Sequence, residues 1–210
     1  MNKRDELQEL WANQYISGDK RSILHLCPRS GKIRTSIRIF CKIQRKIGYK
    51  PRILICYPDK NIQQSWEEDF NSVGYKNPNI EYSTHVSIHK IVDEAYDIIV
   101  CDEIHLLSAN QKAQFKKLMK TNQGSYILGL SGTLSKSTEL ELKSELKLPV
   151  ISNYTLNEAI NDGIISDYKI TIIKTALDDK IIVDKAKKRT EKAKYRAISW
   201  VIENKGQNLF

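Results

Sequence analysis

The chain has 210 residues, enough for one sizeable core, or for one α/β domain and the beginning of a second. Hydrophobic residues make up 40% of it and charged residues 28%, and no apolar run approaches the ~20 residues of a membrane span, so a membrane-embedded protein is not expected. The formal net charge is +9, and residues 1–60 hold the whole excess, with 14 Lys or Arg against 5 Asp or Glu. This excess suits a polyanionic partner such as nucleic acid, and a solvated basic face is the alternative.

Short apolar runs alternate with longer amphipathic ones along the chain, which is the pattern of βαβ units on a parallel sheet. We therefore predict an α/β fold in which helices fill most gaps between strands. The predicted strands cover residues 22–27, 52–57, 80–84, 97–101, 126–131 and 149–153.

The clearest predicted helix covers residues 33–47, where apolar residues at helical spacing form one arc and basic residues the other. Gly48 suits its C-terminal cap. Phe115, Leu118 and Met119 mark another helix.

The pattern changes after residue 153, which predicts a lobe boundary near residue 165. The expected elements are a short helix over 156–162, a turn at Gly163, a β-branched stretch over 168–177 and a charged helix over 184–204.

Cysteines and histidines are too scattered to predict a metal site, and the cysteines are interpreted as buried thiols. The N-terminus has no apolar segment followed by a small-residue cleavage site, so we expect an intracellular protein located in the cytoplasm. The usage of Ile, Lys and Asn suggests a low-GC genome such as that of a phage, which would place the protein in the host cytoplasm.

A candidate phosphate-binding loop, Cys27-Pro28-Arg29-Ser30-Gly31-Lys32, lies between a predicted strand and a predicted helix. In such a loop the backbone N–H groups and the positive end of the helix dipole meet the phosphates, and the Lys reaches the β- and γ-phosphate oxygens. We therefore predict that the loop, including Pro28, Arg29, Ser30 and Gly31, binds nucleotide and that Lys32 contacts phosphate. An ordinary Gly-Lys turn after a strand is the alternative.

Two positions depart from the pattern G-x-x-x-x-G-K-[ST]. Leu26 stands at the first Gly, and Ile33, the last residue of the predicted nucleotide-binding segment, stands where a Mg²⁺-binding hydroxyl is expected. Thr35 lies roughly 200° around the helix and cannot replace that hydroxyl, whereas Ser36 is a poorer substitute nearly one turn later. Either Mg²⁺ is held through water and a downstream acid, or hydrolysis is weak.

Two adjacent carboxylates, Asp102 and Glu103, end an apolar strand, at the edge of a parallel sheet where ligands bind. Asp102 is the predicted Mg²⁺ ligand, through its waters, and Glu103 the residue that orients and deprotonates the attacking water. Two solvated acids at the start of a loop are the alternative, which the upstream phosphate loop disfavours.

Together these motifs resemble superfamily 2 helicases and translocases of the DEAD/DEAH-like group, over approximately residues 4–175. Residues 27–32 match motif I, and Asp102-Glu103-Ile104-His105 is a variant of motif II, Asp-Glu-x-His. The resemblance implies a parallel-sheet P-loop (RecA-like) three-layer sandwich with ATP and Mg²⁺ as cofactors. It also implies that residues 4–8 are the adenine-reading segment, with Gln8 as a base contact.

The resemblance extends to the predicted nucleic-acid and coupling residues. Pro58 and Thr84 lie in segments similar to the two loops that contact the nucleic-acid backbone in the family. Ser131-Gly132-Thr133 matches motif III, which couples nucleotide state to nucleic-acid grip, and His105 would link motif III to the ATP site. Residues 156–165 are similar to the segment that follows motif III.

The family also needs a second RecA-like lobe with an arginine finger, and no segment of this sequence matches one. We expect residues 1–165 to be the ATP-binding lobe, and residues 166–210 a linker strand and helix that begin an incomplete second lobe. The isolated lobe should bind nucleotide weakly and hydrolyse it poorly.

The first functional hypothesis is an ATP-hydrolysing helicase or translocase lobe that grips nucleic acid, DNA in preference to RNA, and works with a second lobe in cis or in trans. The alternative is a non-hydrolysing nucleic-acid-binding or assembly module with a degenerate phosphate loop. A DNA-packaging type of P-loop ATPase is a third reading, which the motif III match disfavours.

Overall fold

The computed structural model describes residues 2–166, 168–173 and 199–204. Contacts divide the chain into two compact units, Met1–Ile165 and Ser166–Phe210, and each is described by itself. The helices and strands of the first unit are α1 (Lys3–Ser17), β1 (Arg21–Leu26), α2 (Lys32–Ile47), β2 (Ile53–Tyr57), α3 (Lys60–Ser72), β3 (Ile80–Thr84), η1 (His85–Lys90), β4 (Ile98–Cys101), η2 (Ile104–Leu106), α4 (Ala109–Thr121), β5 (Tyr126–Ser131), α5 (Lys136–Leu146), β6 (Val150–Tyr154) and α6 (Leu156–Asn161).

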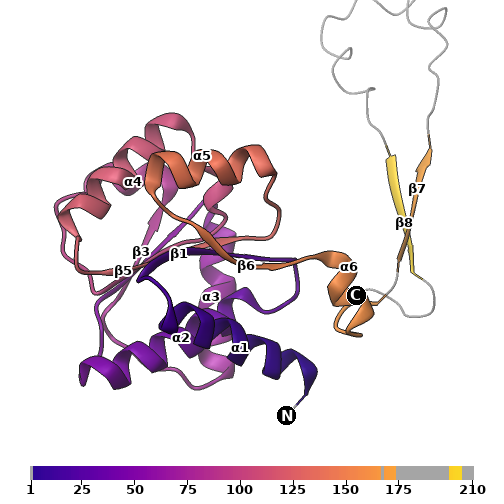
Figure 1. The fold of residues 1–210 in the computed structure, drawn as a ribbon, viewed down its shortest axis with the longest axis horizontal. Coiled ribbons are helices and arrows are strands. Elements are labelled where there is room, and N and C mark those ends of the chain that lie inside the picture. Colours follow the sequence, from indigo (N-terminus) through magenta and orange to yellow (C-terminus); the bar gives the residue numbers. More distant parts are fainter. Residues whose placement is uncertain (1, 167, 174–198, 205–210) are drawn as a thin grey trace, which may run out of the picture. The chain divides into compact units, whose positions relative to one another are not determined.

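Six strands form one sheet in the order β3-β2-β4-β5-β1-β6, and every neighbouring pair is parallel (Figure 1). The predicted α/β fold with a parallel sheet is therefore confirmed. In this order β5 lies between β1 and β4, so the loops that follow these three strands lie next to one another at the carboxyl edge of the sheet.

Helices cover both faces of the sheet, because alternate residues of each strand point to opposite sides. In β2, Ile53 and Ile55 join the cluster that α1, α2 and α3 supply, whereas Leu54 and Cys56 join the cluster that α4 and α5 supply. Figure 1 shows the two helical layers on either side of the strands. The three-layer sandwich predicted from the family resemblance is thus confirmed.

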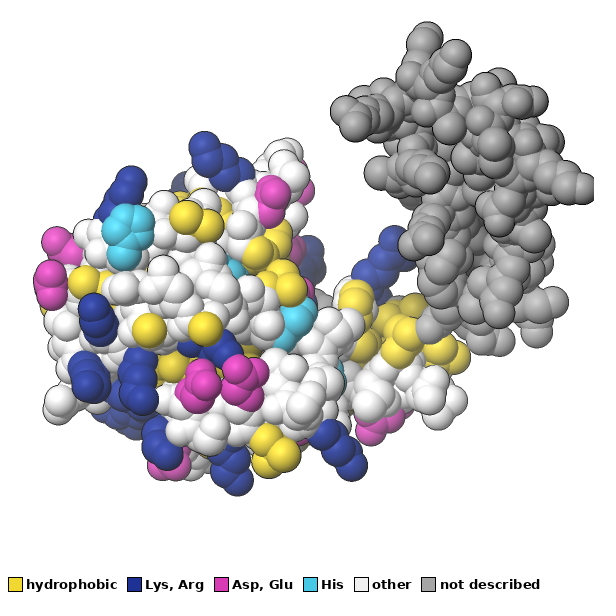
Figure 2. Space-filling view, turned by 90° about the horizontal axis from the view of Figure 1, so that it is seen from above, with side chains coloured by type: hydrophobic (Ala, Val, Ile, Leu, Met, Phe, Trp, Pro, Cys, Tyr) yellow, Lys and Arg dark blue, Asp and Glu magenta, His cyan; other side chains and the backbone are white. Residues whose placement is uncertain are grey.

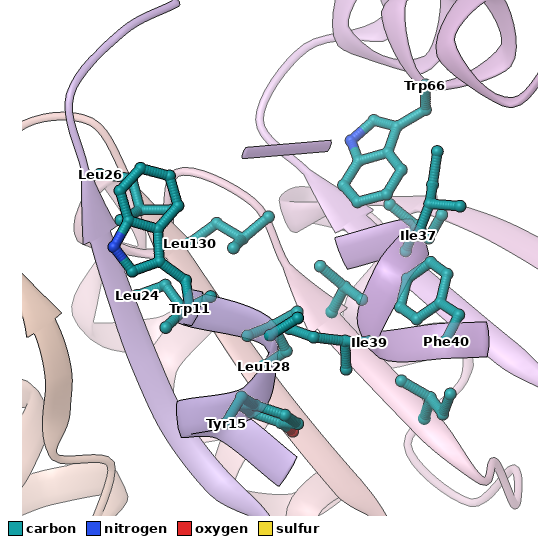
Figure 3. Close-up of a cluster of buried hydrophobic side chains, with 14 of the residues drawn as sticks. Trp11, Tyr15, Leu24, Leu26, Ile37, Ile39, Phe40, Trp66, Leu128 and Leu130 are labelled. Atoms are coloured by element: carbon teal, nitrogen blue, oxygen red, sulfur yellow. The ribbon is translucent and has the colours of Figure 1, made fainter. Parts of the chain in front are cut away.

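Aromatic residues anchor the layer of α1, α2 and α3 (Figure 3). Tyr15 from α1, Phe40 from α2 and Trp66 from α3 are each at most 1% exposed. Phe40 and Trp66 stack with ring centroids 6.2 Å apart. Burial of each such side chain contributes about 1.5–3 kcal/mol, so this layer fixes the helices against the sheet.

Helix α2 begins one residue before the predicted range and ends at Ile47 as predicted. Glycine bounds it at both ends in the left-handed conformation, with φ 95° at Gly31 and φ 83° at Gly48. The Gly48 N–H donates to the carbonyl of Gln44 and so caps the last turn. All six predicted strands are also present, each with both boundaries within one residue of the prediction.

The second unit contains β7 (Tyr168–Ile173) and β8 (Ser199–Asn204), which pair antiparallel. The helix predicted over 184–204 is wrong for residues 199–204, and its remainder lies outside the described residues, as do residues 174–177 of the predicted β-branched stretch. The run Trp200-Val201-Ile202 favours a strand, and its pairing with 170–172 satisfies the backbone of both segments. No described helix is long and apolar enough to cross a membrane.

Candidate active site at the carboxyl edge of the sheet

The loop between β1 and α2 is a tight turn held by Ser30, which is fully buried. The Ser30 hydroxyl donates to the carbonyl of Cys27 over 2.7 Å, and Arg29 and Gly31 both have positive φ. No side chain caps the N-terminus of α2 at Gly31. The free N–H groups and the helix dipole there suit an anion, while Pro28 and Arg29 lie exposed on the outside of the turn.

Gln8 of α1 packs directly on this loop and is 1% exposed. Its Nε2 donates to the carbonyl of Ser30 over 3.2 Å, and a Cβ on Gly31 would lie 2.1 Å from that nitrogen. The Gln8 Oε1 is buried without a hydrogen-bond partner among the described residues. Gln8 also lines an open groove of about 520 Å³ between α1, α2 and residues 73–75.

Lys32 and Glu103 join the phosphate loop to the acidic strand end. The Lys32 Nζ forms an ion pair with Glu103 Oε1, and the Gly132 N–H donates to Glu103 Oε2 over 3.2 Å. Burial raises the pKa of Glu103, but the hydrogen bond and charge of Lys32 outweigh it, so the pKa lies below its usual value. Glu103 has φ 47°, a strained conformation for a non-glycine residue.

Asp102 is 4% exposed and is fixed by three neighbouring segments. Its Oδ2 accepts from the Trp66 indole over 3.0 Å, its N–H donates to the carbonyl of Cys56 over 2.8 Å, and its own carbonyl contacts His85 Nε2 at 3.0 Å. Burial raises the pKa of Asp102, while the charge of Lys32 opposes this. Such a carboxylate can contribute one oxygen to Mg²⁺, an ion that otherwise keeps waters and phosphate oxygens.

His105 connects Glu103 with the loop after β5. Its Nδ1 lies 2.8 Å from the Ser131 hydroxyl and 3.4 Å from Glu103 Oε2, and its Nε2 lies 3.3 Å from the Thr133 hydroxyl. Because the Ser131 hydroxyl donates to the carbonyl of Thr133, we assign the ring proton to Nδ1. Burial lowers the pKa of His105, which favours the neutral ring at pH 7.

The hydroxyl groups near Ile33 do not supply a Mg²⁺ ligand. Thr35 and Ser36 are fully buried in α2, where their hydroxyls donate to the carbonyls of Gly31 and Lys32. Ser36 therefore does not replace the missing hydroxyl, and Ile33 itself is partly buried against the core.

Pro58 and Thr84 lie at the carboxyl ends of the neighbouring strands β2 and β3, where Tyr57 and Thr84 are paired. Neither has a hydrogen bond to Lys32 or Glu103 among the described residues. Trp66 and His85, which lie in the segments that follow β2 and β3, contact Asp102, and the sequence analysis predicts neither contact. No sequence pattern marks these two contacts, because both partners come together only through the strand order.

The basic residues of α2 are largely balanced by acids of neighbouring helices. Arg38 pairs with Asp5 and Glu9, and Lys42 also pairs with Glu9. In the face shown by Figure 2, Lys and Arg side chains are most numerous at the lower left of the first unit. Part of the positive charge of α2 is thus offset by neighbouring acids.

The fold of the first unit is similar to that of solved helicase and ATPase domains, as the family resemblance of the sequence predicts. No protein-family model matches the chain.

Among curated proteins, the chain is 23% identical over 185 residues to the type I restriction enzyme EcoAI endonuclease subunit of Escherichia coli, and this covers 77% of the chain. The Pyrococcus furiosus Hef helicase domain matches 74% of the chain with a TM-score of 0.57 and 17% identity. The Sulfolobus solfataricus SWI2/SNF2 ATPase core in complex with double-stranded DNA matches 65% with a TM-score of 0.51 and 17% identity. The chain spans 22%, 40% and 33% of these proteins, respectively.

Proposed function

We propose that the chain is the ATP-binding lobe of a nucleic-acid-dependent ATPase of the helicase or translocase type. The observation that carries this proposal is the ion pair between Lys32 and Glu103, held beside Gly132. Residues 71 positions apart in the sequence meet there, which supports a shared role for them in ATP hydrolysis.

The phosphate loop and Gln8 are the proposed nucleotide contacts. The uncapped N-terminus of α2 offers N–H donors to phosphate oxygens. The unpartnered Oε1 of Gln8 is an acceptor of the kind that the amino group of adenine needs. These features fit ATP, although Gln8 already donates to the loop carbonyl of Ser30.

In the proposed mechanism Lys32 exchanges Glu103 for phosphate. When Lys32 turns to the β- and γ-phosphate oxygens, Glu103 loses the cation that holds its pKa down, and burial then raises that pKa. Glu103 takes a proton from water while the water oxygen bonds to the γ-phosphorus and the bond from that phosphorus to the ADP oxygen breaks. The ion pair is thus the resting state of the base.

Asp102 would hold Mg²⁺, which neutralises charge on the transferred phosphoryl group. His105 contacts Glu103 as well as Ser131 and Thr133. A movement of the Glu103 carboxylate would therefore be transmitted to the loop after β5.

The proposed partners are nucleic acid, DNA in preference to RNA, and a second RecA-like lobe in cis or in trans. The SWI2/SNF2 core whose fold matches is bound to double-stranded DNA, and the curated relative is a restriction endonuclease subunit. The boundary between Ile165 and Ser166 supports residues 166–210 as the start of the connection to that lobe.

Hydrolysis is tested under single-turnover conditions, with protein in excess over labelled ATP, because slow reactions are then measurable. We expect DNA to accelerate phosphate release and Glu103→Gln to reduce it by at least about 100-fold, the usual contribution of a general base. Glu6→Gln, at an exposed position of α1, is the matched control. Equal phosphate release by Glu103→Gln and the unaltered protein would rule out the mechanism.

The second candidate function is a nucleic-acid-binding or assembly module that does not hydrolyse ATP. The observation that favours it is Ile33, with the hydroxyls of Thr35 and Ser36 buried in the helix. Binding of DNA without binding of Mg²⁺ and ATP would select this function.

A further inference from the structure

Asp102 is held by hydrogen bonds from the two segments that also carry the proposed nucleic-acid contacts. One segment follows β2 and contains Pro58, and the other follows β3 and contains Thr84. Trp66 belongs to the first and His85 to the second, and neither side chain has a part in the mechanism derived above.

Trp66 connects the Pro58 loop to the carboxylate. Helix α3 begins directly after this loop, with Asp59 as its N-cap, and reaches Trp66 within two turns. The Trp66 indole is fully buried in the core (Figure 3). Its Nε1 nevertheless donates to Asp102 Oδ2 over 3.0 Å. Because a helix is stiff over this length, a displacement of the loop changes the position of the donor.

His85 connects the Thr84 loop to the backbone of the same residue. It is 3% exposed, and its Nε2 lies 3.0 Å from the carbonyl oxygen of Asp102. A carbonyl only accepts, so Nε2 carries the proton and donates. The Thr84 hydroxyl lies 3.0 Å from that of Ser87, which ties Thr84 to the same 3-10 turn.

The two contacts act on different atoms of Asp102, and a third bond, from its N–H to the carbonyl of Cys56, ties it to β2 just before Pro58. Movement of either loop therefore changes the position of the Asp102 carboxylate or of the backbone that precedes Glu103. Core packing alone needs neither an indole N–H nor an imidazole N–H directed at this residue, because Phe would fill much of the same space.

On the basis of the proposed function, we infer that Trp66 and His85 are positioning residues that couple nucleic-acid binding at the Pro58 and Thr84 loops to the alignment of Asp102 and Glu103. Nucleic acid bound at the two loops determines the geometry of the two hydrogen bonds. These hydrogen bonds in turn determine the positions of the Asp102 and Glu103 carboxylates. By reciprocity, Mg²⁺ and ATP at Asp102 strengthen the grip on nucleic acid.

The first experiment follows the indole signals of the ¹⁵N-labelled chain, which has three tryptophans. The signals are assigned with Trp66→Phe and Trp11→Phe, and a double-stranded DNA oligonucleotide is added without nucleotide. We expect the Trp66 signal to shift by more than its linewidth and the Trp11 signal to stay in place. DNA binding seen by fluorescence anisotropy with an unmoved Trp66 signal would overturn the inference.

The second experiment measures the affinity for Mg²⁺ and ATP with and without the same DNA. We expect DNA to increase the affinity at least about fivefold, at the lower end of ordinary coupling. Trp66→Phe and His85→Phe should reduce this factor to below about twofold, whereas His85→Gln, which keeps an N–H donor, should retain it. Trp11→Phe is the matched control, since Trp11 lies in the same buried cluster but packs on Tyr154.

Full coupling in both Phe variants would overturn the inference and leave the proposed function standing. Absence of binding to both DNA and ATP in the unaltered protein would instead overturn the proposed function, and the inference with it.

Discussion

Gly31 has two separate reasons to be glycine. Its φ of 95° is strained for any residue with a Cβ, and a Cβ there would meet Gln8 Nε2 at 2.1 Å. Gly48 at the other end of α2 shares the first reason, with φ 83°, but nothing lies within 4 Å of its Cβ position. A comparison of substitutions at the two glycines therefore distinguishes the effect of backbone strain from that of the close contact with Gln8.

We predict that Gly48→Ala lowers the free energy of unfolding by about 1–2 kcal/mol through strain alone, and that Gly31→Ala lowers it by about 1 kcal/mol more. In a Gln8→Ala background this additional loss should disappear, because the clash is removed. Urea denaturation of the four variants measures these differences. Equal losses for Gly31→Ala and Gly48→Ala would show that Gln8 does not constrain the loop.

At the scale of elements, the sequence predicts the first unit well because its strands are buried on both faces. Runs such as 53–57 and 98–101 are apolar throughout, so their existence and direction follow from composition and from the helices between them. The sequence predicts a helix over residues 199–204, whereas the structure has a strand there. This strand depends on its pairing with a distant segment, as between Trp200 and Ile172, and a local sequence pattern does not contain that information.

Some features of the candidate site can likewise be predicted from the sequence, whereas others cannot. The sequence predicts the phosphate loop and the acids, because each is a local motif at a strand end. The ion pair of Lys32 with Glu103, by contrast, follows from the position of β5 between β1 and β4. The contacts of Trp66 and His85 with Asp102 depend likewise on tertiary structure, so no local motif predicts them.

Asn122, at the end of α4, ties this helix to the segment before β4. It is 4% exposed, its Oδ1 accepts from the Tyr96 N–H over 2.7 Å, and its Nδ2 donates to the carbonyls of Glu94 and Leu118, each over 2.9 Å.

We predict that Asn122→Ala lowers the free energy of unfolding by about 2–3 kcal/mol, because it leaves buried backbone groups without partners. Asn153→Ala, at an exposed position of β6, should change it by no more than about 0.5 kcal/mol. Thermal or denaturant unfolding measures the free energy of unfolding of both variants. A loss below about 1 kcal/mol for Asn122→Ala would contradict the role of Asn122 in tying α4 to the segment before β4.

At the scale of the whole molecule, we propose that the described part of the chain supplies one face of an ATP site. In ATPases with paired lobes, an arginine from the second lobe stabilises charge on the transferred phosphoryl group. The chain covers 22% of its curated relative and 40% or less of the two solved chains described above. Binding of nucleotide, which we expect of this lobe alone, is therefore a more direct test of its function than the rate of hydrolysis.

The most direct measurement is calorimetric titration of the chain with ATP in the presence and absence of Mg²⁺. We predict Mg²⁺-dependent binding that Lys32→Ala weakens by at least about 10-fold, as the loss of a charge-assisted hydrogen bond implies. Lys46→Ala, at an exposed position of the same helix, should bind ATP as the unaltered protein does. Binding that is absent, or that is the same in Lys32→Ala, would contradict the assignment of this edge of the sheet as an ATP site.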